Sequence, residues 1–232
     1  LEKGGIIYTQ RETVDKVEKM KVCTCLNPLH TALAVSGCLL GYTLISKEMA
    51  DADLKKMVEI AGYTEGLPVV VDPKILSPKQ FIDEVVNIRI PNPFMPDTPQ
   101  RIACDTSQKL SIRFGETIKA YQKNGMDLDS LKVIPMVFAL WLRYLMAIDD
   151  EGKAFELSPD PLLSQVTPVV AGIKLGKTFD VHAVCSKILC REDIFGQDLY
   201  KTNIAGKVEK FFAELCSGTG AVRRVIHETV SK

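Results

Sequence analysis

A run of 24 uncharged residues, 22–45, is the feature that most constrains how this chain can fold, because it contains no Asp, Glu, Lys or Arg. A helix of that length could span a lipid bilayer. However, the run includes Asn27, Pro28, His30 and several small polar residues, and polar groups at this density are costly in lipid. We therefore predict a helix buried at the centre of a globular domain and no membrane span.

A second apolar segment, 131–148, leads to the same interpretation. It is interrupted by Lys132, Pro135 and Arg143, so it does not offer a continuous apolar surface to lipid. We predict another core helix here, one that could equally contribute to an interface through Trp141 and Tyr144.

Residues that typically start or end helices recur through the rest of the chain. Apolar residues recur at helical spacing over 12–26, and Asn27-Pro28 should end that helix and start the next, with Asn27 as the N-cap of a helix over 28–40. Further helices are predicted to begin at Ser77, to cover 101–123, and to run from Asp129 or Ser130 through Trp141. After a loop at 149–161, helices are predicted over 161–173, over 179–191 and, with breaks, over 204–230. The only strand candidates, 5–9 and 67–71, lack partners with matching alternation. The predicted fold is mainly α, one multi-helical domain with at most a short strand near the N-terminus.

Composition and motifs exclude several functions. The 29 basic residues balance the 29 acidic ones, which argues against binding to nucleic acid or to an anionic membrane. Seven cysteines in mostly apolar surroundings indicate reduced thiols in a cytoplasmic protein, and Cys23-x-Cys25 lacks the spacing of a zinc site, so we predict no metal. The chain has no glycine-rich dinucleotide fingerprint and no phosphate-binding loop. This chain alone is therefore not expected to bind a nucleotide cofactor.

Three polar residues next to the apolar run form a candidate site: Lys21, Asn27 and His30. Apolar surroundings favour the neutral amine of a lysine, which suits a general acid or base. An amide and a neutral imidazole can donate hydrogen bonds to an oxygen that gains negative charge. The three groups together would suit the interconversion of a carbonyl and an alcohol. Structural roles remain open: Asn27 as a cap, His30 as a core histidine and Lys21 reaching solvent.

Two sequence blocks resemble the polyol-specific long-chain dehydrogenases, the family of mannitol dehydrogenase and fructuronate reductase. The first is GGIIY…VEKMKVCTCLNPLHTALA, which is similar to the family's K-x4-N-x2-H arrangement. The second is RIPNPFMPDTPQRI at 89–102, which is similar to R-F-x-N-P-x3-D-T-x2-R-I, with Ile90 in place of the usual Phe. Lys109 lies eight residues after Arg101, where the family has another substrate-contacting lysine. The resemblance covers nearly the whole chain.

The resemblance implies a metal-independent, NAD(H)-dependent oxidoreductase with a helical C-terminal catalytic domain. Lys21 would be the general acid in ketone reduction and the general base in alcohol oxidation. Asn27 and His30 would hold and polarise the reacting oxygen, while Arg101 and Lys109 would bind the rest of the substrate. NAD(H) would be bound mainly by an N-terminal Rossmann domain that this chain lacks. Residues 1–12 would be the connection from that domain, residues 13–232 the catalytic domain, and this chain alone is not expected to turn over substrate.

One departure from the family pattern concerns the lysine. Here the spacing is K-x5-N, with Val22 at the family's lysine position counted back from Asn27. On a regular helix, one extra residue would turn Lys21 by about 100° away from the site. We predict that a π-bulge within 21–28, or the break at Asn27-Pro28, restores its direction.

The substrate and the reaction class remain open at this stage. Two positive charges, Arg101 and Lys109, favour a keto-uronate such as fructuronate, reduced to a sugar acid such as mannonate. Mannitol or another polyol is the alternative substrate, and a non-catalytic helical interaction module is the alternative class. Convergence of the five candidate residues on one cleft would favour the enzyme, and a missing domain would leave an exposed apolar patch near them.

Overall fold

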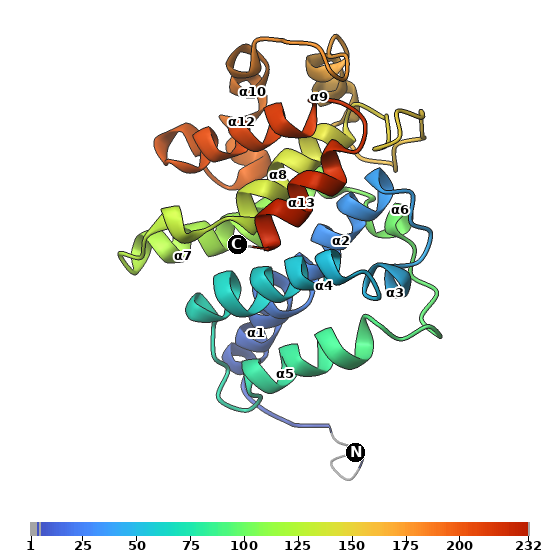
Figure 1. Ribbon diagram of the computed structural model, residues 1–232. Helices are drawn as coiled ribbons and strands as arrows, with labels where there is room; N and C mark the ends of the chain where they lie inside the picture. Colours follow the sequence, from blue (N-terminus) through green and yellow to red (C-terminus); the bar gives the residue numbers. More distant parts are fainter. Residues whose placement is uncertain (1–3, 5, 232) are drawn as a thin grey trace.

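The computed structural model describes residues 4 and 6–231, which form a helical assembly with no strand pairing beyond a single bridge between Ile148 and Ala154 (Figure 1). The α-helices are α1 (Arg11–Met20), α2 (Asn27–Leu39), α3 (Ile45–Glu48), α4 (Ala52–Glu59), α5 (Pro78–Glu84), α6 (Pro99–Ile102), α7 (Glu116–Lys123), α8 (Val133–Tyr144), α9 (Leu163–Val170), α10 (Val181–Leu189), α11 (Glu192–Phe195), α12 (Ile204–Leu215) and α13 (Ala221–Val230). π-Helical turns occupy Lys21–Cys25, Ile60–Gly66, Val85–Arg89 and Ser111–Gly115. Short 3-10 turns occupy Leu67–Val69, Thr106–Gln108, Leu128–Ser130 and Leu199–Lys201. The mainly α prediction for a single domain is confirmed.

Both strand candidates are wrong within the described residues. Residues 6–9 have no regular secondary structure, and residue 5 lies outside the described part of the chain. In the second candidate, Leu67–Val69 forms a 3-10 turn. Ile6 and Ile7 are exposed, whereas Leu67, Val69 and Val70 pack against the core without joining a sheet.

The two apolar segments form the centre of the fold, as predicted. All twelve residues of α8 and eleven of the thirteen in α2 are buried. The buried guanidinium of Arg143 in α8 donates from its two terminal nitrogens to the carbonyls of Ile148 at 2.5 Å and Asp149 at 2.9 Å, while Nε has no partner among the described residues. The continuous helical stretch Arg11–Leu39 is long and apolar enough to cross a membrane by composition, yet 78% of its most apolar window is buried within the protein.

The long helix predicted over 101–123 is broken into four short pieces. Asp105 adopts a left-handed backbone conformation, with φ of 53°, and its amide donates to the carbonyl of Pro159 at 2.8 Å. The carboxylate of Asp160 then accepts hydrogen bonds from the amide and hydroxyl of Ser107, at 2.7 and 2.5 Å. These partners lie more than fifty residues away in sequence, so no local pattern could reveal the break.

The start of α8 also differs from the prediction. Neither Asp129 nor Ser130 begins it; the helix starts at Val133, after a 3-10 turn. Its cap is the buried side chain of Glu65, which accepts from the amides of Lys132 and Val133 at 2.7 Å and of Ile134 at 2.9 Å. A carboxylate from a distant turn therefore satisfies amides that a local N-cap would otherwise satisfy.

Replacing Glu65 by Gln should lower the free energy of unfolding by about 2–3 kcal/mol, because the amide group turns one acceptor into a donor facing buried N–H groups. Urea unfolding followed by the fluorescence of Trp141, the single tryptophan, measures the loss directly on this helix. Glu59→Gln is the matched control, since Glu59 is only in a surface pair with Lys56 at 3.7 Å. Equal stabilities of the two variants would contradict the capping role.

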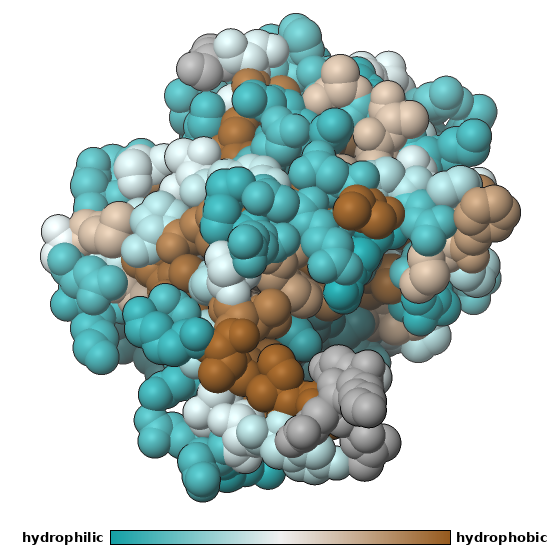
Figure 2. All heavy atoms as spheres, turned by 90° about the horizontal axis from the view of Figure 1, so that it is seen from below, coloured by the Kyte–Doolittle hydropathy of each residue, from teal (hydrophilic) through white to brown (hydrophobic). Residues whose placement is uncertain are grey.

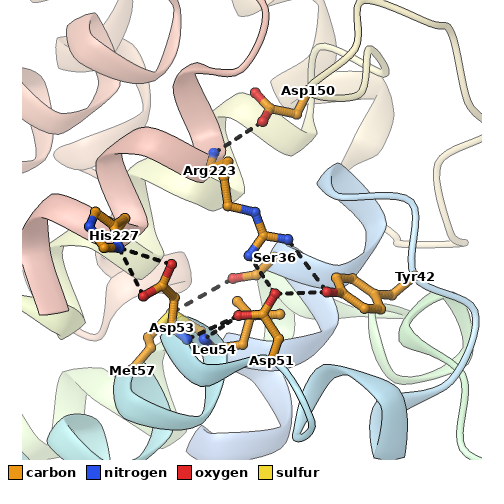
Figure 3. Close-up of polar contacts among 9 residues, drawn as sticks. All are labelled: Ser36, Tyr42, Asp51, Asp53, Leu54, Met57, Asp150, Arg223 and His227. Carbon is orange, nitrogen blue, oxygen red and sulfur yellow. Dashed lines mark hydrogen bonds and ion pairs between the residues drawn. The ribbon is translucent and has the colours of Figure 1, made fainter. Parts of the chain in front are cut away.

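Hydrogen bonds and ion pairs connect the C-terminal helix α13 to the N-terminal end of α4 (Figure 3). The guanidinium of Arg223 donates to Asp51 at 2.5 Å, and the hydroxyl of Tyr42 donates to the same carboxylate at 2.8 Å. One turn further along α13, His227 lies 3.0 Å from a carboxylate oxygen of Asp53. These contacts join the end of the chain to the half that contains the candidate site.

Candidate functional site

The chain around Lys21 has the predicted irregularity. Residues Lys21–Cys25 form a π-helical turn between α1 and α2, so the extra residue between Lys21 and Asn27 is absorbed by a wider turn. The ammonium of Lys21 lies over the ring of Phe81, 5.3 Å from its centroid, and the side chain is half-buried. Lys21 therefore lies against the domain and does not extend freely into solvent.

Phe81 connects Lys21 to a second cation. The guanidinium carbon of Arg89 lies 5.2 Å from the centroid of the same ring, and Arg89 also pairs with Glu84 at 2.8 Å. Arg89 is one of the residues that line a cavity of about 190 Å³. Lys21 does not line the cavity itself, but it shares the ring of Phe81 with Arg89, which does.

Six of the seven residues that line the cavity come from the two sequence blocks of the resemblance, and the seventh is Ile45. Its lining residues are Leu26, His30, Ile45, Arg89, Ile90, Met95 and Asp97. Of the five candidate residues, only His30 lines it directly. Three larger hollows, of about 300, 310 and 410 Å³, are lined by none of the five. The small cavity is therefore the candidate site, although the five residues do not all open onto it.

The imidazole of His30 has its pKa lowered, first by burial and then by the positive charges of Arg113 and Arg101, against an opposing effect of Asp97. A histidine shifted this way is neutral at neutral pH, so one ring nitrogen can accept a hydrogen bond while the other donates. That is the form required to hold the oxygen of a carbonyl or an alcohol.

Arg101 reaches the cavity indirectly. Its guanidinium forms an ion pair with Asp97, which lines the cavity, and its own side chain is 62% exposed. Asp97 is fixed from the other side as well, because its carbonyl accepts from the amide of Ile45 at 2.9 Å. In this arrangement the charge of Arg101 is largely balanced by a neighbouring carboxylate.

Lys109 does not line the cavity and lies in the broken segment that replaces the predicted long helix. Its ammonium donates to the carbonyls of Cys104 and, at 3.2 Å, Ile102. Burial, and then the charge of Arg113, lowers the pKa of Lys109. The left-handed turn at Asp105 exposes those carbonyls to Lys109, so the break positions this side chain.

Arg113 is a residue of the site that the sequence interpretation missed. It lies on the π-helical turn Ser111–Gly115, and its guanidinium donates to the hydroxyl of Thr31, the residue after His30. Burial lowers the pKa of Arg113 to about 10. The spacing of four residues from Lys109, which places the two on one helix face, was the available signal.

Asn27 is half-buried and does not cap α2. The helix already includes Asn27, Leu26 occupies the N-cap position, and no side-chain hydrogen bond caps this end. The carbonyl of Asn27 accepts from Thr31 at 3.0 Å, and within residues 4 and 6–231 its side-chain amide makes no hydrogen bond. The prediction of an N-cap is therefore wrong, and the amide has no structural role that we can identify.

Metal coordination finds no support among the described residues, where no group of three or more His, Cys, Asp or Glu side chains could hold an ion. All seven cysteines are free thiols.

Comparison with known proteins identifies the family of the chain. Residues 13–216 match the family described as the mannitol dehydrogenase C-terminal domain. The chain belongs to this family. It is 53% identical, over 98% of its length, to a D-mannonate oxidoreductase of Thermotoga maritima, and it covers 42% of that relative. A D-mannonate oxidoreductase of Escherichia coli is 26% identical over 86% of the chain, which covers 39% of that relative.

Solved structures of other family members share the fold. Mannitol 2-dehydrogenase of Pseudomonas fluorescens, in a ternary complex with NAD and D-mannitol, matches 94% of the chain with a TM-score of 0.81 at 22% identity. The chain covers 42% of that protein. It thus spans about two fifths of the length of the relatives named here, and it corresponds to the mannitol dehydrogenase C-terminal domain within them.

Proposed function

We propose that this chain is the substrate-binding and catalytic domain of an NAD(H)-dependent oxidoreductase that interconverts a keto-uronate and its sugar acid, as fructuronate and mannonate. The observation that carries the proposal is the 53% identity to a D-mannonate oxidoreductase over nearly the whole chain. The cavity at His30 is lined by one cation, Arg89, and the positive charges of Arg101 and Arg113 are near enough to act on the imidazole, which supports the binding of an anionic substrate.

In this proposal each candidate residue has one role. Lys21 donates a proton to the ketone oxygen during reduction and accepts it from the alcohol during oxidation. Asn27 and His30 hold that oxygen, and Arg101 and Lys109 bind the remainder of the substrate. NADH, bound mainly by another domain of the parent protein, supplies the hydride to the carbonyl carbon. The site of this chain therefore handles the proton and the substrate.

The surface of the domain supports a covering partner. Every large hydrophobic side chain that is exposed in the described part of the chain lies between residues 6 and 112. Three of these are close to the cavity in sequence or line it: Ile88 at 65%, Phe94 at 90% and Met95 at 50% exposure. Figure 2 views the end of the molecule that carries α1 and α5 and shows hydrophobic surface gathered there between hydrophilic areas. The apolar patch expected near the cluster is present, and we propose that the cofactor domain covers it, with residues 1–12 as the connection.

The test uses the full-length parent protein. Oxidation of NADH is followed with fructuronate, tagaturonate and fructose in parallel. Turnover of a keto-uronate with a kcat/KM well above that for fructose is expected. Preference for fructose would indicate a polyol dehydrogenase, and no turnover of any of the three substrates would favour a non-catalytic helical module.

The free thiols fit a cytoplasmic location, which we propose on that basis alone.

A further inference from the structure

We propose that Arg113 binds the carboxylate of the substrate and so gives the site its preference for sugar acids over neutral sugars. The inference rests on the proposed function and assigns to that site a residue that neither sequence block contains. It is carried by the different states of three arginines near His30: Arg89 lines the cavity, and the charges of Arg101 and Arg113 act on the imidazole.

Two of these arginines are already neutralised. Arg89 pairs with Glu84 and lies on Phe81, while Arg101 pairs with Asp97 and is mostly exposed. Arg113 forms no ion pair with any acidic residue among those the structure describes, and it is half-buried. Its one side-chain hydrogen bond is to a neutral hydroxyl, that of Thr31. Removing a guanidinium from water without pairing it with a carboxylate costs free energy, and a bound anion would offset that cost.

The position of Arg113 fits such an anion. Its partner Thr31 directly follows His30 on α2, and Arg113 is close enough to influence the imidazole electrostatically. A guanidinium has five donors, so a single bond to Thr31 leaves a pair free for both oxygens of a carboxylate. A substrate with its ketone oxygen at His30 could therefore extend its carboxylate toward Arg113.

Lys109 strengthens the positive potential at this point. It lies one helical turn before Arg113, and the amide of Arg113 donates to the carbonyl of Lys109 at 2.9 Å. The charge of Arg113 lowers the pKa of Lys109, so the two cations repel each other. An anion bound between them would relieve that repulsion, whereas a hydroxymethyl group would not.

The experiment compares Arg113→Gln, Arg113→Lys and the control Arg224→Gln in the full-length protein. Arg224 is a suitable control because it lies on the exposed face of α13, paired with Glu228 at 3.5 Å. Steady-state reduction of fructuronate and fructose is measured with NADH, together with the inhibition constants of mannonate and mannitol. The sugar acids carry the carboxylate that their neutral counterparts lack.

For Arg113→Gln, kcat/KM with fructuronate should fall about 10- to 100-fold, mainly through KM, and the inhibition constant of mannonate should rise by a similar factor. The values for fructose and mannitol should change by less than about threefold, which also shows that the fold is intact. For Arg113→Lys, kcat/KM with fructuronate should lie between the values for the unaltered protein and for Arg113→Gln. An ammonium keeps the positive charge but cannot donate two parallel hydrogen bonds to a carboxylate.

Equal losses for the acidic and neutral compounds, or no loss for either, would overturn the assignment of Arg113 while leaving the proposed function in place. An unaltered protein that does not prefer fructuronate to fructose would overturn the proposed function, and the assignment with it. The two failures are thus distinguished by the unaltered protein alone.

Discussion

Replacement of Lys21 by Ala in the full-length protein is expected to lower kcat for keto-uronate reduction by about 10²- to 10⁴-fold, the contribution typical of a positioned general acid. The ammonium of Lys21 lies over Phe81, the ring that the cavity-lining Arg89 also contacts, and the π-helical turn absorbs the extra residue before Asn27. Steady-state kinetics with fructuronate and NADH measure the effect. KM should change little, because the proton is transferred only in the chemical step.

Two further variants separate proton transfer from charge. Lys21→Arg keeps a cation near Phe81 but holds its proton too firmly to act as an acid near neutral pH, so it should be about as impaired as Lys21→Ala. Lys16→Ala is the control, since Lys16 only pairs with Glu12 on the surface at 2.6 Å. High activity in Lys21→Arg would show that the charge matters and that the proton comes from elsewhere.

A buried carboxyl group, that of Glu48, is expected to make the stability of the domain depend strongly on pH. Glu48 has 0% exposure, and neither carboxyl oxygen has a hydrogen-bond partner among the described residues. It fits against α2 only because residue 37 is glycine: a Cβ there would lie 2.2 Å from Glu48 Oε1. Burial, and then the charge of Asp51, raises the pKa of Glu48 to about 9.

The sign of the effect follows from proton binding. Between its ordinary pKa of 4.5 and about 9, Glu48 keeps its proton in the folded protein and loses it in the unfolded chain. The free energy of unfolding should therefore fall as pH rises through this range, by about 1.4 kcal/mol per pH unit from this group. Glu48→Gln removes the titration, so its stability relative to the unaltered chain should increase steadily from pH 5.5 to pH 8.5.

Urea unfolding at several pH values, followed by Trp141 fluorescence, measures that difference. Trp141 suits the purpose because it is the single tryptophan and is only 1% exposed. Glu228→Gln provides the control, because Glu228 is paired with Arg224 on the surface and should show no such trend. A constant difference between Glu48→Gln and the unaltered chain would mean that Glu48 is ionised in the folded protein.

Much of the fold could be predicted from local signals. Ser77 caps α5 through the amide of Gln80, at 3.3 Å, and α7 ends at Lys123, both as the sequence indicated. The buried central helices followed from the apolar runs, because a segment without charges must be removed from water. Within the site, the π-helical turn at Lys21 could be predicted because a one-residue change in spacing has few geometric solutions.

The sequence by itself therefore determined the helical class and most of the helix positions, since these depend on periodicity and on neighbouring residues. Only the tertiary structure decided which distant residues form hydrogen bonds with the helix ends and with the side chains near the site. Glu65 caps α8 from outside that helix, and Asp160 holds the break that places Lys109. The same break positions the turn that carries Arg113 beside Thr31. Such contacts join residues more than fifty positions apart, and hydrogen bonds between distant segments leave no periodic trace in a single sequence.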